Sequence, residues 1–280
     1  MPLIDTRSEN FLNTMTHNLL RVSSDFKQQG FSESNSNFQQ CYNNIHANEG
    51  VFRVVMKSCD IPNVFYNIDQ TGFSFLNTGN NKLVWVNASN VITSSTIPRG
   101  QYSITQLLSA INLSLFPAYT PNGSVKLIYN AITQKIEISN TSGQSFGISV
   151  NSTIAPYLGI LSEVLWTTTI SVPFAGFPNL AGIQEVYITS QKISDGSNMI
   201  VASNTMYPVI LNVQMSVPFW AFQHYETNHP EIDDIEYASI SQGTSIRQVD
   251  IQLRDRFGNI LDLGGLPFNL IMKVYHVNNS

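Results

Sequence analysis

The sequence predicts a chain dominated by β-structure: a single jelly-roll β-sandwich with a small α+β insertion and an extended N-terminal arm. Two observations lead to this fold class. Short runs that alternate apolar and polar residues recur along the chain, and turn-forming Gly, Pro, Asn and Asp residues separate them. Only 12% of the residues are charged, against roughly 25% in a typical soluble domain, while Val, Ile, Thr and aromatic residues are plentiful.

Residues 1–50 form the predicted arm. This segment is polar and poorly periodic, with the cluster S-E-S-N-S-N at 32–37 and scattered apolar residues such as Leu19, Leu20 and Phe38. A segment that cannot bury its own apolar groups tends to stay disordered until a neighbour supplies a surface. Two interpretations therefore stay open, an arm that becomes ordered on assembly and an ordinary flexible terminus.

Residues 51–65 begin the predicted jelly-roll domain, and residues 66–163 form the predicted insertion. The run from Val51 is a strand that ends at Pro62. Within the insertion we expect strands at 82–87, 125–129, 135–139 and 146–150. We expect one helix, capped by Ser103, because apolar residues follow at helical spacing: Ile104, Leu107, Leu108, Ile111 and Leu115.

Residues 164–280 return to strands without helices and complete the predicted sandwich. Near the C-terminus, Val249, Ile251 and Leu253 alternate with polar residues, and the stretch 268–274 repeats this pattern. The connection between the two runs is rich in turn residues, so we expect them to pair as an antiparallel hairpin. Together with the strand at Val51, these strands are about eight in number, as in a jelly roll.

Composition argues against several function classes. With a net charge of -5, the chain has no basic stripe for phosphate contacts, and no specific nucleic acid is expected as a partner. No apolar run reaches the roughly eighteen residues of a membrane span, and the N-terminus lacks signal-peptide features, which predicts synthesis in a reducing compartment. Cys41 and Cys59, the two cysteines, lack zinc-site spacing and are expected to be free thiols.

The segment 219–234, F-W-A-F-Q-H-Y-E-T-N-H-P-E-I-D-D, is the strongest metal-site candidate. It holds His224 and His229 together with Glu226 and Glu231, but Pro230 interrupts any helix that could place two histidines one turn apart. We interpret it as a solvated loop. The chain also lacks a G-x-S-x-G, a P-loop and a G-x-G-x-x-G motif. We therefore expect no enzyme, no cofactor, and no catalytic, cofactor-binding or metal-ligating residue.

Aromatic residues give a second candidate site, because aromatic rings stack on the apolar faces of sugars. The candidates are Trp85, Trp166, Trp220, Phe219, Phe222 and Tyr225. Core or interface packing is the commoner use of such residues. Both interpretations stay open, and a sugar-binding insertion would depend on Trp85.

Five motifs follow one another along the chain: I-P-N-V-F-Y-N-I at 61–68, I-P-R-G-Q-Y-S-I-T-Q-L-L-S-A-I-N at 97–112, A-P-Y-L-G-I at 155–160, P-N-L-A-G-I-Q-E-V-Y-I-T-S at 178–190, and R-D-R-F-G-N-I-L-D-L at 254–263. In this order they resemble the penton, or vertex, capsid proteins of virophages, polinton-like viruses and related double-stranded DNA viruses with double-jelly-roll major capsid proteins. The chain is too short for a double jelly roll, which favours the penton.

The resemblance implies a homopentamer at the five-fold vertices of an icosahedral capsid. It further implies contacts with major capsid protein trimers and with minor capsid proteins, synthesis in the host cytoplasm, and location in the virion. Two alternatives stay open: a host-attachment or carbohydrate-binding module that recognises a host receptor, and a minor cement capsid protein.

Overall fold

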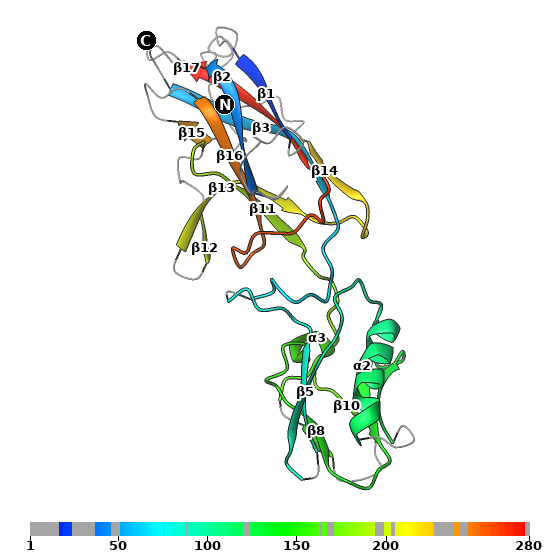
Figure 1. Ribbon diagram of the computed structural model, residues 1–280. Coiled ribbons are helices and arrows are strands. Elements are labelled where there is room, and N and C mark those ends of the chain that lie inside the picture. Colours follow the sequence, from blue (N-terminus) through cyan, green and yellow to red (C-terminus); the bar gives the residue numbers. More distant parts are fainter. Residues whose placement is uncertain are drawn as a thin grey trace, which may run out of the picture. The chain divides into compact units, whose positions relative to one another are not determined.

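The computed structural model describes residues 17–23, 37–45, 51–74, 76–87, 89–119, 124–162, 164–166, 171–193, 199–202, 205–226, 238–240 and 246–277. The chain divides into two compact units. The first combines Met1–Val64 with Gln184–Ser280, and the second is the continuous segment Phe65–Ile183 (Figure 1).

The described part of the first unit contains two antiparallel five-stranded sheets. One sheet has the order β1 (His17–Ser23), β17 (Asn269–Val277), β3 (Val51–Pro62), β14 (Phe222–Glu226), with β15 (Ala238–Ile240) also paired to β3. The other has the order β12 (Met199–Ala202), β13 (Thr205–Gln214), β11 (Glu185–Thr189), β16 (Ile246–Arg254), β2 (Asn37–Ile45).

Each of these sheets buries one apolar face. On β16 Val249, Ile251 and Leu253 are fully buried, and on β17 the same is true of Leu270 and Met272. Alternation along each strand places such residues on one side of the sheet. The two buried faces form the core of a sandwich, and the predicted fold class, a strand-dominated jelly roll, is confirmed.

The predicted C-terminal hairpin is wrong. Both runs are strands, but β16 pairs with β11 and β2, whereas β17 pairs with β1 and β3. The two strands therefore lie in different sheets, joined by residues 255–268. Alternation reveals which face of a strand is buried, and it does not reveal which strand lies beside it.

The prediction that residues 1–50 lack structure of their own is corrected at two places. Strand β1 pairs with β17 along its whole length, and β2 pairs with β16. Val22 of β1 is completely buried. An added strand is held largely by backbone hydrogen bonds, which its polar side chains do not reveal. The remaining residues of this segment, 1–16, 24–36 and 46–50, lie outside the described residues.

The second unit contains two small antiparallel sheets, a long helix and a short one. The first sheet has the order β5 (Ile92–Thr96), β4 (Lys82–Asn87), β8 (Phe146–Ile148), β9 (Val164–Trp166). The second has the order β10 (Ser171–Pro173), β7 (Lys135–Asn140), β6 (Val125–Asn130). The helices are α2 (Ile104–Tyr119) and α3 (Ala155–Leu158). One apolar cluster, which includes Trp85, Leu107, Ile111, Leu127 and Ile138, forms the core.

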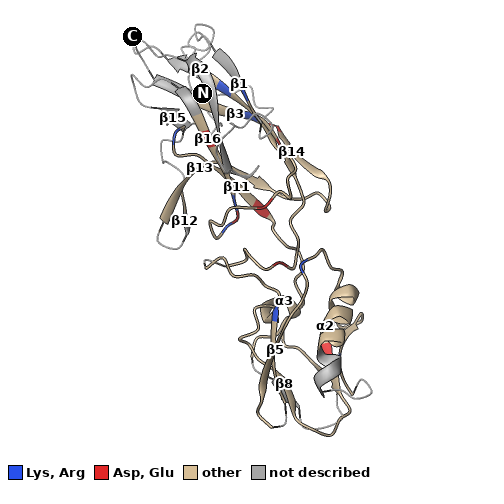
Figure 2. Ribbon diagram, viewed as in Figure 1, with Lys and Arg blue, Asp and Glu red and all other residues tan. Residues whose placement is uncertain are grey.

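The limits of this unit differ from those of the predicted insertion, 66–163. Strand β9 pairs with β8, and β10 pairs with β7, so residues 164–183 belong with the second unit instead of the sandwich. Short β-rich runs look alike in sequence whichever sheet they join, because both sheets bury one face. Charged side chains are sparse in the second unit (Figure 2).

Helix α2 begins as predicted. The Gln106 backbone N–H donates to Ser103 Oγ at 3.3 Å, and the Ser103 N–H donates to Gln106 Oε1 at 2.9 Å. This reciprocal pair is a capping box, which satisfies two backbone donors at the helix start. Leu107, Leu108 and Ile111 are buried against the core. The spacing of apolar residues therefore predicted both the helix and its buried face.

Strand β6 lies at the edge of its sheet and is partly closed by a side chain from α2. The Leu127 N–H donates to Asn112 Oδ1 at 2.8 Å, and Asn112 Nδ2 donates to the Leu127 carbonyl at 3.0 Å. An edge strand otherwise presents such groups unpaired to any other chain. The Asn112 amide thus occupies the position that another strand would take.

Candidate functional site

The turn before β14 presents an exposed tryptophan. Trp220 is 68% exposed and has φ +72°, a left-handed conformation that non-glycine residues seldom adopt. Asn63, just beyond β3, holds the turn through three hydrogen bonds of 2.7 Å. Its N–H donates to the Ala221 carbonyl, its carbonyl accepts from the Trp220 N–H, and its Nδ2 donates to the Val217 carbonyl. These bonds hold the backbone of Trp220 in its strained conformation, which leaves the indole exposed.

Two further aromatic residues lie beside this tryptophan in the chain. The ring of Phe219 packs edge-to-face against Trp220, with 5.0 Å between the ring centroids. Phe222, the first residue of β14, is 52% exposed. Large exposed aromatic side chains are the residues that most often carry the binding energy of protein interfaces. We call Trp220, Phe219 and Phe222 the aromatic turn.

Strand β14 continues this surface with charged groups. Phe222, His224 and Glu226 occupy alternate positions and face the same side of the sheet. His224 lies directly opposite Asp60 of β3, and its Nδ1 is 2.6 Å from Asp60 Oδ1. Its Nε2 is 3.7 Å from Glu226 Oε2, and Glu226 Oε1 is 3.6 Å from Lys57 Nζ. The result is a row of alternating charge across two strands.

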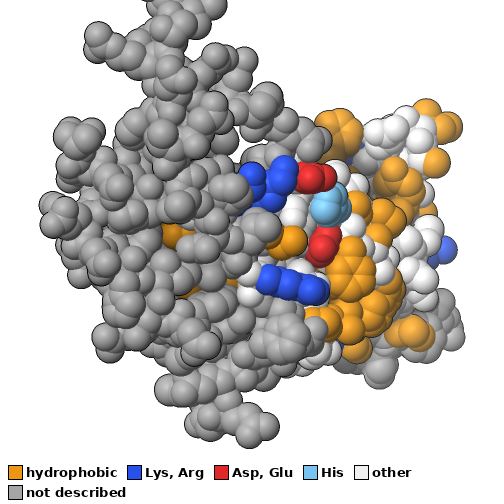
Figure 3. Space-filling model, turned by 90° about the horizontal axis from the view of Figure 1, so that it is seen from above, with side chains coloured by type: hydrophobic (Ala, Val, Ile, Leu, Met, Phe, Trp, Pro, Cys, Tyr) orange, Lys and Arg blue, Asp and Glu red, His pale blue; other side chains and the backbone are white. Residues whose placement is uncertain are grey.

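The surroundings of His224 favour its protonated form. The hydrogen bond with Asp60 raises the pKa of His224 above its usual value, and the charges of Asp60 and Glu226 act in the same direction, while partial desolvation opposes them. Figure 3 shows the histidine between two acidic side chains, with hydrophobic side chains close by. An apolar patch beside paired charges is the usual composition of a protein–protein contact surface.

The predicted histidine cluster is only partly described. Residues 222–226 form a strand and not the predicted loop, since they pair with β3 over their whole length. His229 and Glu231 lie outside the described residues. Within the described part, no group of three His, Cys, Asp or Glu side chains could hold a metal ion. Sequence reasoning missed Asp60, Lys57 and Asn63, because only the strand pairing brings them to β14.

The aromatic candidates separate into two groups. Trp85 is 1% exposed and stacks on Phe146 in the core of the second unit, with 5.8 Å between centroids, so it cannot serve as a sugar platform. Trp220 and Phe222 are exposed, as a binding surface requires. The side chain of Trp166 lies outside what the structure describes.

Two other features bear on chemistry and location. Cys59 is a free thiol with 1% exposure, and its burial, together with the charge of Asp60, raises its pKa to about 12. A thiol in that state is a poor nucleophile, because the thiolate is the reactive form. No helix among the described residues is long and apolar enough to cross a membrane.

The closing motif, residues 254–263, is a turn whose first two residues, Arg254 and Asp255, are buried. The Asp255 carboxylate is 3% exposed and accepts hydrogen bonds from the backbone N–H groups of Phe257 and Asn259, at 2.8 and 2.9 Å. Arg254 stacks on the ring of Tyr207 at 3.6 Å and donates to the Gly258 carbonyl. Gly258 adopts φ +82°, which glycine tolerates without strain. Arg254 and Asp255 thus stabilise the connection between the two sheets.

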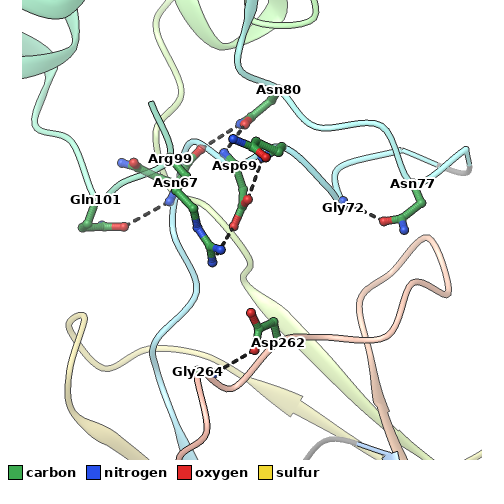
Figure 4. A network of polar contacts seen from close by, with 10 residues as sticks. Asn67, Asp69, Gly72, Asn77, Asn80, Arg99, Gln101, Asp262 and Gly264 are labelled. Carbon is green, nitrogen blue, oxygen red and sulfur yellow. Dashed lines mark hydrogen bonds and ion pairs between the residues drawn. The ribbon is translucent and has the colours of Figure 1, made fainter. Parts of the chain in front are cut away.

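Three of the other motifs meet at Asn67 in the second unit. Asn67 Nδ2 donates to the carbonyls of Tyr102 and Leu180, at 2.8 and 3.1 Å, and Asn67 Oδ1 accepts from the Tyr102 N–H at 2.9 Å. The Asn67 carbonyl accepts from Asn80 Nδ2 at 2.7 Å. Figure 4 shows part of this network, the contacts of Asn67 with Asn80 and with Gln101, whose Oε1 accepts from the Asn67 N–H. The asparagine therefore joins segments far apart in sequence.

Comparison with known proteins identifies the fold. No family model matches the sequence, and no curated protein matches it. Among solved structures, the mavirus penton protein aligns with 92% of this chain and 99% of its own, at a TM-score of 0.52 and 9% sequence identity. The chain has the fold of the mavirus penton protein. The resemblance to virophage penton proteins that the sequence motifs predicted is confirmed at the level of fold.

Two structures from bacteriophage P23-77 also match. The complex of its major capsid proteins VP16 and VP17 aligns with 93% of this chain and 99% of its own, with 5% identity and a TM-score of 0.20. The capsid protein VP17 aligns with 93% of this chain and 96% of its own, with 7% identity and a TM-score of 0.18. Scores this low add nothing to the fold assignment.

Proposed function

We propose that this chain is a structural virion protein, the penton subunit of an icosahedral capsid. In this proposal, five copies form a homopentamer at each five-fold vertex and contact the surrounding major capsid proteins. The supporting observation is the alignment with the mavirus penton protein over 92% of this chain and 99% of that one. The TM-score of that alignment, 0.52, indicates that the two chains share a fold.

The physical properties of the first unit support an assembly role. A ring of identical subunits needs one surface that binds a different surface on the next copy, and it closes when the rotation between copies is fixed. The aromatic turn supplies apolar side chains held in place by Asn63, and β14 supplies charged groups beside them. We place one side of the subunit contact at this surface, with Trp220 at its centre.

The proposal is tested by the mass of the purified full-length protein in solution, measured by light scattering after gel filtration. The expected mass is five times the 31.2 kDa of one chain. Trp220→Ser should shift the protein to monomers, because loss of a central aromatic residue typically weakens an interface by about 2 kcal/mol or more.

Ile132→Ser is the matched control for this test. Ile132 is 95% exposed and lies in the second unit, so its replacement changes surface hydrophobicity without touching the aromatic turn. The control should keep the mass of the unaltered protein. A stable dimer or trimer, or a monomer at the highest soluble concentration, contradicts the pentamer. A pentamer that survives Trp220→Ser contradicts the assigned contact surface alone.

A further inference from the structure

The two ring nitrogens of His224 face two different carboxylates. Nδ1 faces Asp60 of β3 at 2.6 Å, and Nε2 faces Glu226 of its own strand at 3.7 Å. A carboxylate can only accept a hydrogen bond, so the proton of the neutral ring belongs on Nδ1. In that state Nε2 carries a lone pair directed at the negative charge of Glu226. The neutral histidine therefore satisfies one of its neighbours and repels the other.

Proton uptake changes this arrangement. The proton comes from solvent and binds Nε2, which turns the lone pair into an N–H donor. The present 3.7 Å separation is longer than a hydrogen bond, and a short movement of the exposed Glu226 side chain would close it. The imidazolium then bonds both carboxylates: the bond with Asp60 crosses from β14 to β3 and becomes charge-assisted, and the bond with Glu226 lies within β14 and orients the ring. Charged hydrogen bonds of this kind are stronger than neutral ones.

We propose that Asp60, His224 and Glu226 form a proton-operated latch that fastens the edge strand β14, and with it the aromatic turn, to β3. Strand β14 has only five residues and, among the described strands, pairs with β3 alone. The latch lies at the middle residue of that strand, opposite Asp60. The inference does not depend on the proposed function, because it concerns one strand within one subunit.

Among the residues that the structure describes, few charged groups surround the latch. From β3, Asp60 faces His224 directly, and Lys57 acts through Glu226, which it contacts at 3.6 Å. From β14 itself, Glu226 is the charged neighbour. The preceding turn, residues 215–221, has no charged side chain, and β17 places the uncharged Asn269 opposite Asp60. Lys57, Asp60 and Glu226 together carry one negative charge, which the protonated His224 cancels.

The direction of the pH dependence follows from these contacts. The pKa of His224 is raised above its value in an unfolded chain, chiefly by the hydrogen bond with Asp60. A raised pKa means that the folded state binds the proton more tightly than the unfolded state does. The stabilisation is therefore complete below the pKa of an unfolded histidine, about 6.5, and is lost as the pH rises through the pKa of folded His224.

Hydrogen exchange followed by mass spectrometry on the full-length protein tests the latch. Exchange of the imidazole Cε1 hydrogen reports the half-protonation point of one histidine at a time. For His224 we expect a value above about 6.5, the usual value for histidine. Asp60→Asn should lower it most, and Glu226→Gln should lower it less, because Asp60 makes the shorter contact.

Backbone exchange in the same experiment reports the fastening of the strand. After correction for the intrinsic pH dependence of exchange, residues 222–226 should be better protected at pH 6 than at pH 9, by up to about fivefold for an exposed ion pair. His224→Gln should remove this difference. The control Glu185→Gln removes a carboxylate on β11, as Glu226→Gln does on β14, and should preserve the difference.

Two results would overturn the latch. One is a His224 half-protonation point at or below that of an ordinary histidine, or one that Asp60→Asn leaves unchanged. The other is protection of residues 222–226 that varies with pH as much in His224→Gln as in the unaltered protein.

Discussion

The two units of this chain achieve order in opposite ways. The second unit is a continuous segment, Phe65–Ile183, whose hairpins and helix form mostly between neighbours in sequence. The first unit is built from both ends of the chain, and β3 pairs there with β17, more than two hundred residues later. Local signals therefore describe the second unit well, whereas the first depends on pairings that no local pattern contains.

The units also differ in how they use polar groups. Residues 65–183 include four basic and three acidic residues, so the second unit has a net charge of +1. The first unit has a net charge of -6, because the whole chain carries -5. In the second unit, neutral amides of Asn67, Asn80 and Asn112 tie segments together. In the first, charged side chains gather on the outer face of β3 and β14. In the second unit, hydrogen bonds of neutral amides hold the segments together. In the first unit, the charged side chains lie on an exposed strand surface.

The largest test of this comparison removes a core side chain from each unit. Trp85→Ala in the second unit and Phe268→Ala in the first, both at most 1% exposed, should each lower the free energy of unfolding by about 3–5 kcal/mol. Urea denaturation read by hydrogen exchange of each segment should show the loss in the altered unit. If either variant lowered the free energy of unfolding equally in both units, the two units would unfold together. The contrast between a locally ordered unit and one that depends on distant pairings would then be wrong.

Surface aromatic residues give the controls for that experiment. Phe177→Ala in the second unit and Phe222→Ala in the first remove rings that are 63% and 52% exposed. Each should change the free energy of unfolding by less than about 1 kcal/mol.

A smaller effect should follow from loss of the amide at Asn67. Asn67→Ala removes three side-chain hydrogen bonds, leaves partly buried backbone groups of Tyr102 and Leu180 without this partner, and should cost about 2–3 kcal/mol in the second unit. Chemical denaturation of the purified variant measures this loss. Asn151→Ala, at an exposed asparagine of the same unit, should change stability by less than about 0.5 kcal/mol. A loss at Asn67 no larger than that of the control would show that the network does not hold the unit together.

The smallest effect should come from an ion pair in the second unit. Arg99 Nη2 lies 3.5 Å from Asp69 Oδ2, with the arginine side chain 49% exposed. Arg99→Met keeps most of the side-chain length and should cost less than about 1 kcal/mol, because exposed ion pairs contribute little. Thermal unfolding at low and high salt checks this. A loss of stability as large as that of Asn67→Ala would contradict the expectation that amide hydrogen bonds stabilise this unit more than its ion pairs do.

Much of the second unit could be predicted from sequence because its signals are local. Ser103 and Gln106 mark the start of α2, and Leu107 and Ile111 mark its buried face. The sequence did not show where the second unit ends. Strands β9 and β10 look like sandwich strands, and only their pairing with β8 and β7 assigns them to the second unit.

The first unit shows what local patterns leave out. Alternation at Val249, Ile251 and Leu253 predicted a buried strand face, and the same reasoning suggested a hairpin partner that proved wrong. Strands β1 and β2 were missed because backbone hydrogen bonds, which every residue can make, recruit them into the sheets. The candidate surface was visible as exposed aromatics and a histidine, but Asp60 joins it only through the pairing of β14 with β3.

The side-chain amide of Asn112 has a consequence for solubility. In a concentrated protein solution, an open sheet edge invites fibrous self-association. The amide pairs with both backbone groups of Leu127, as a neighbouring peptide unit would. A strand from another chain must first displace this amide, so one asparagine side chain opposes polymerisation along this edge.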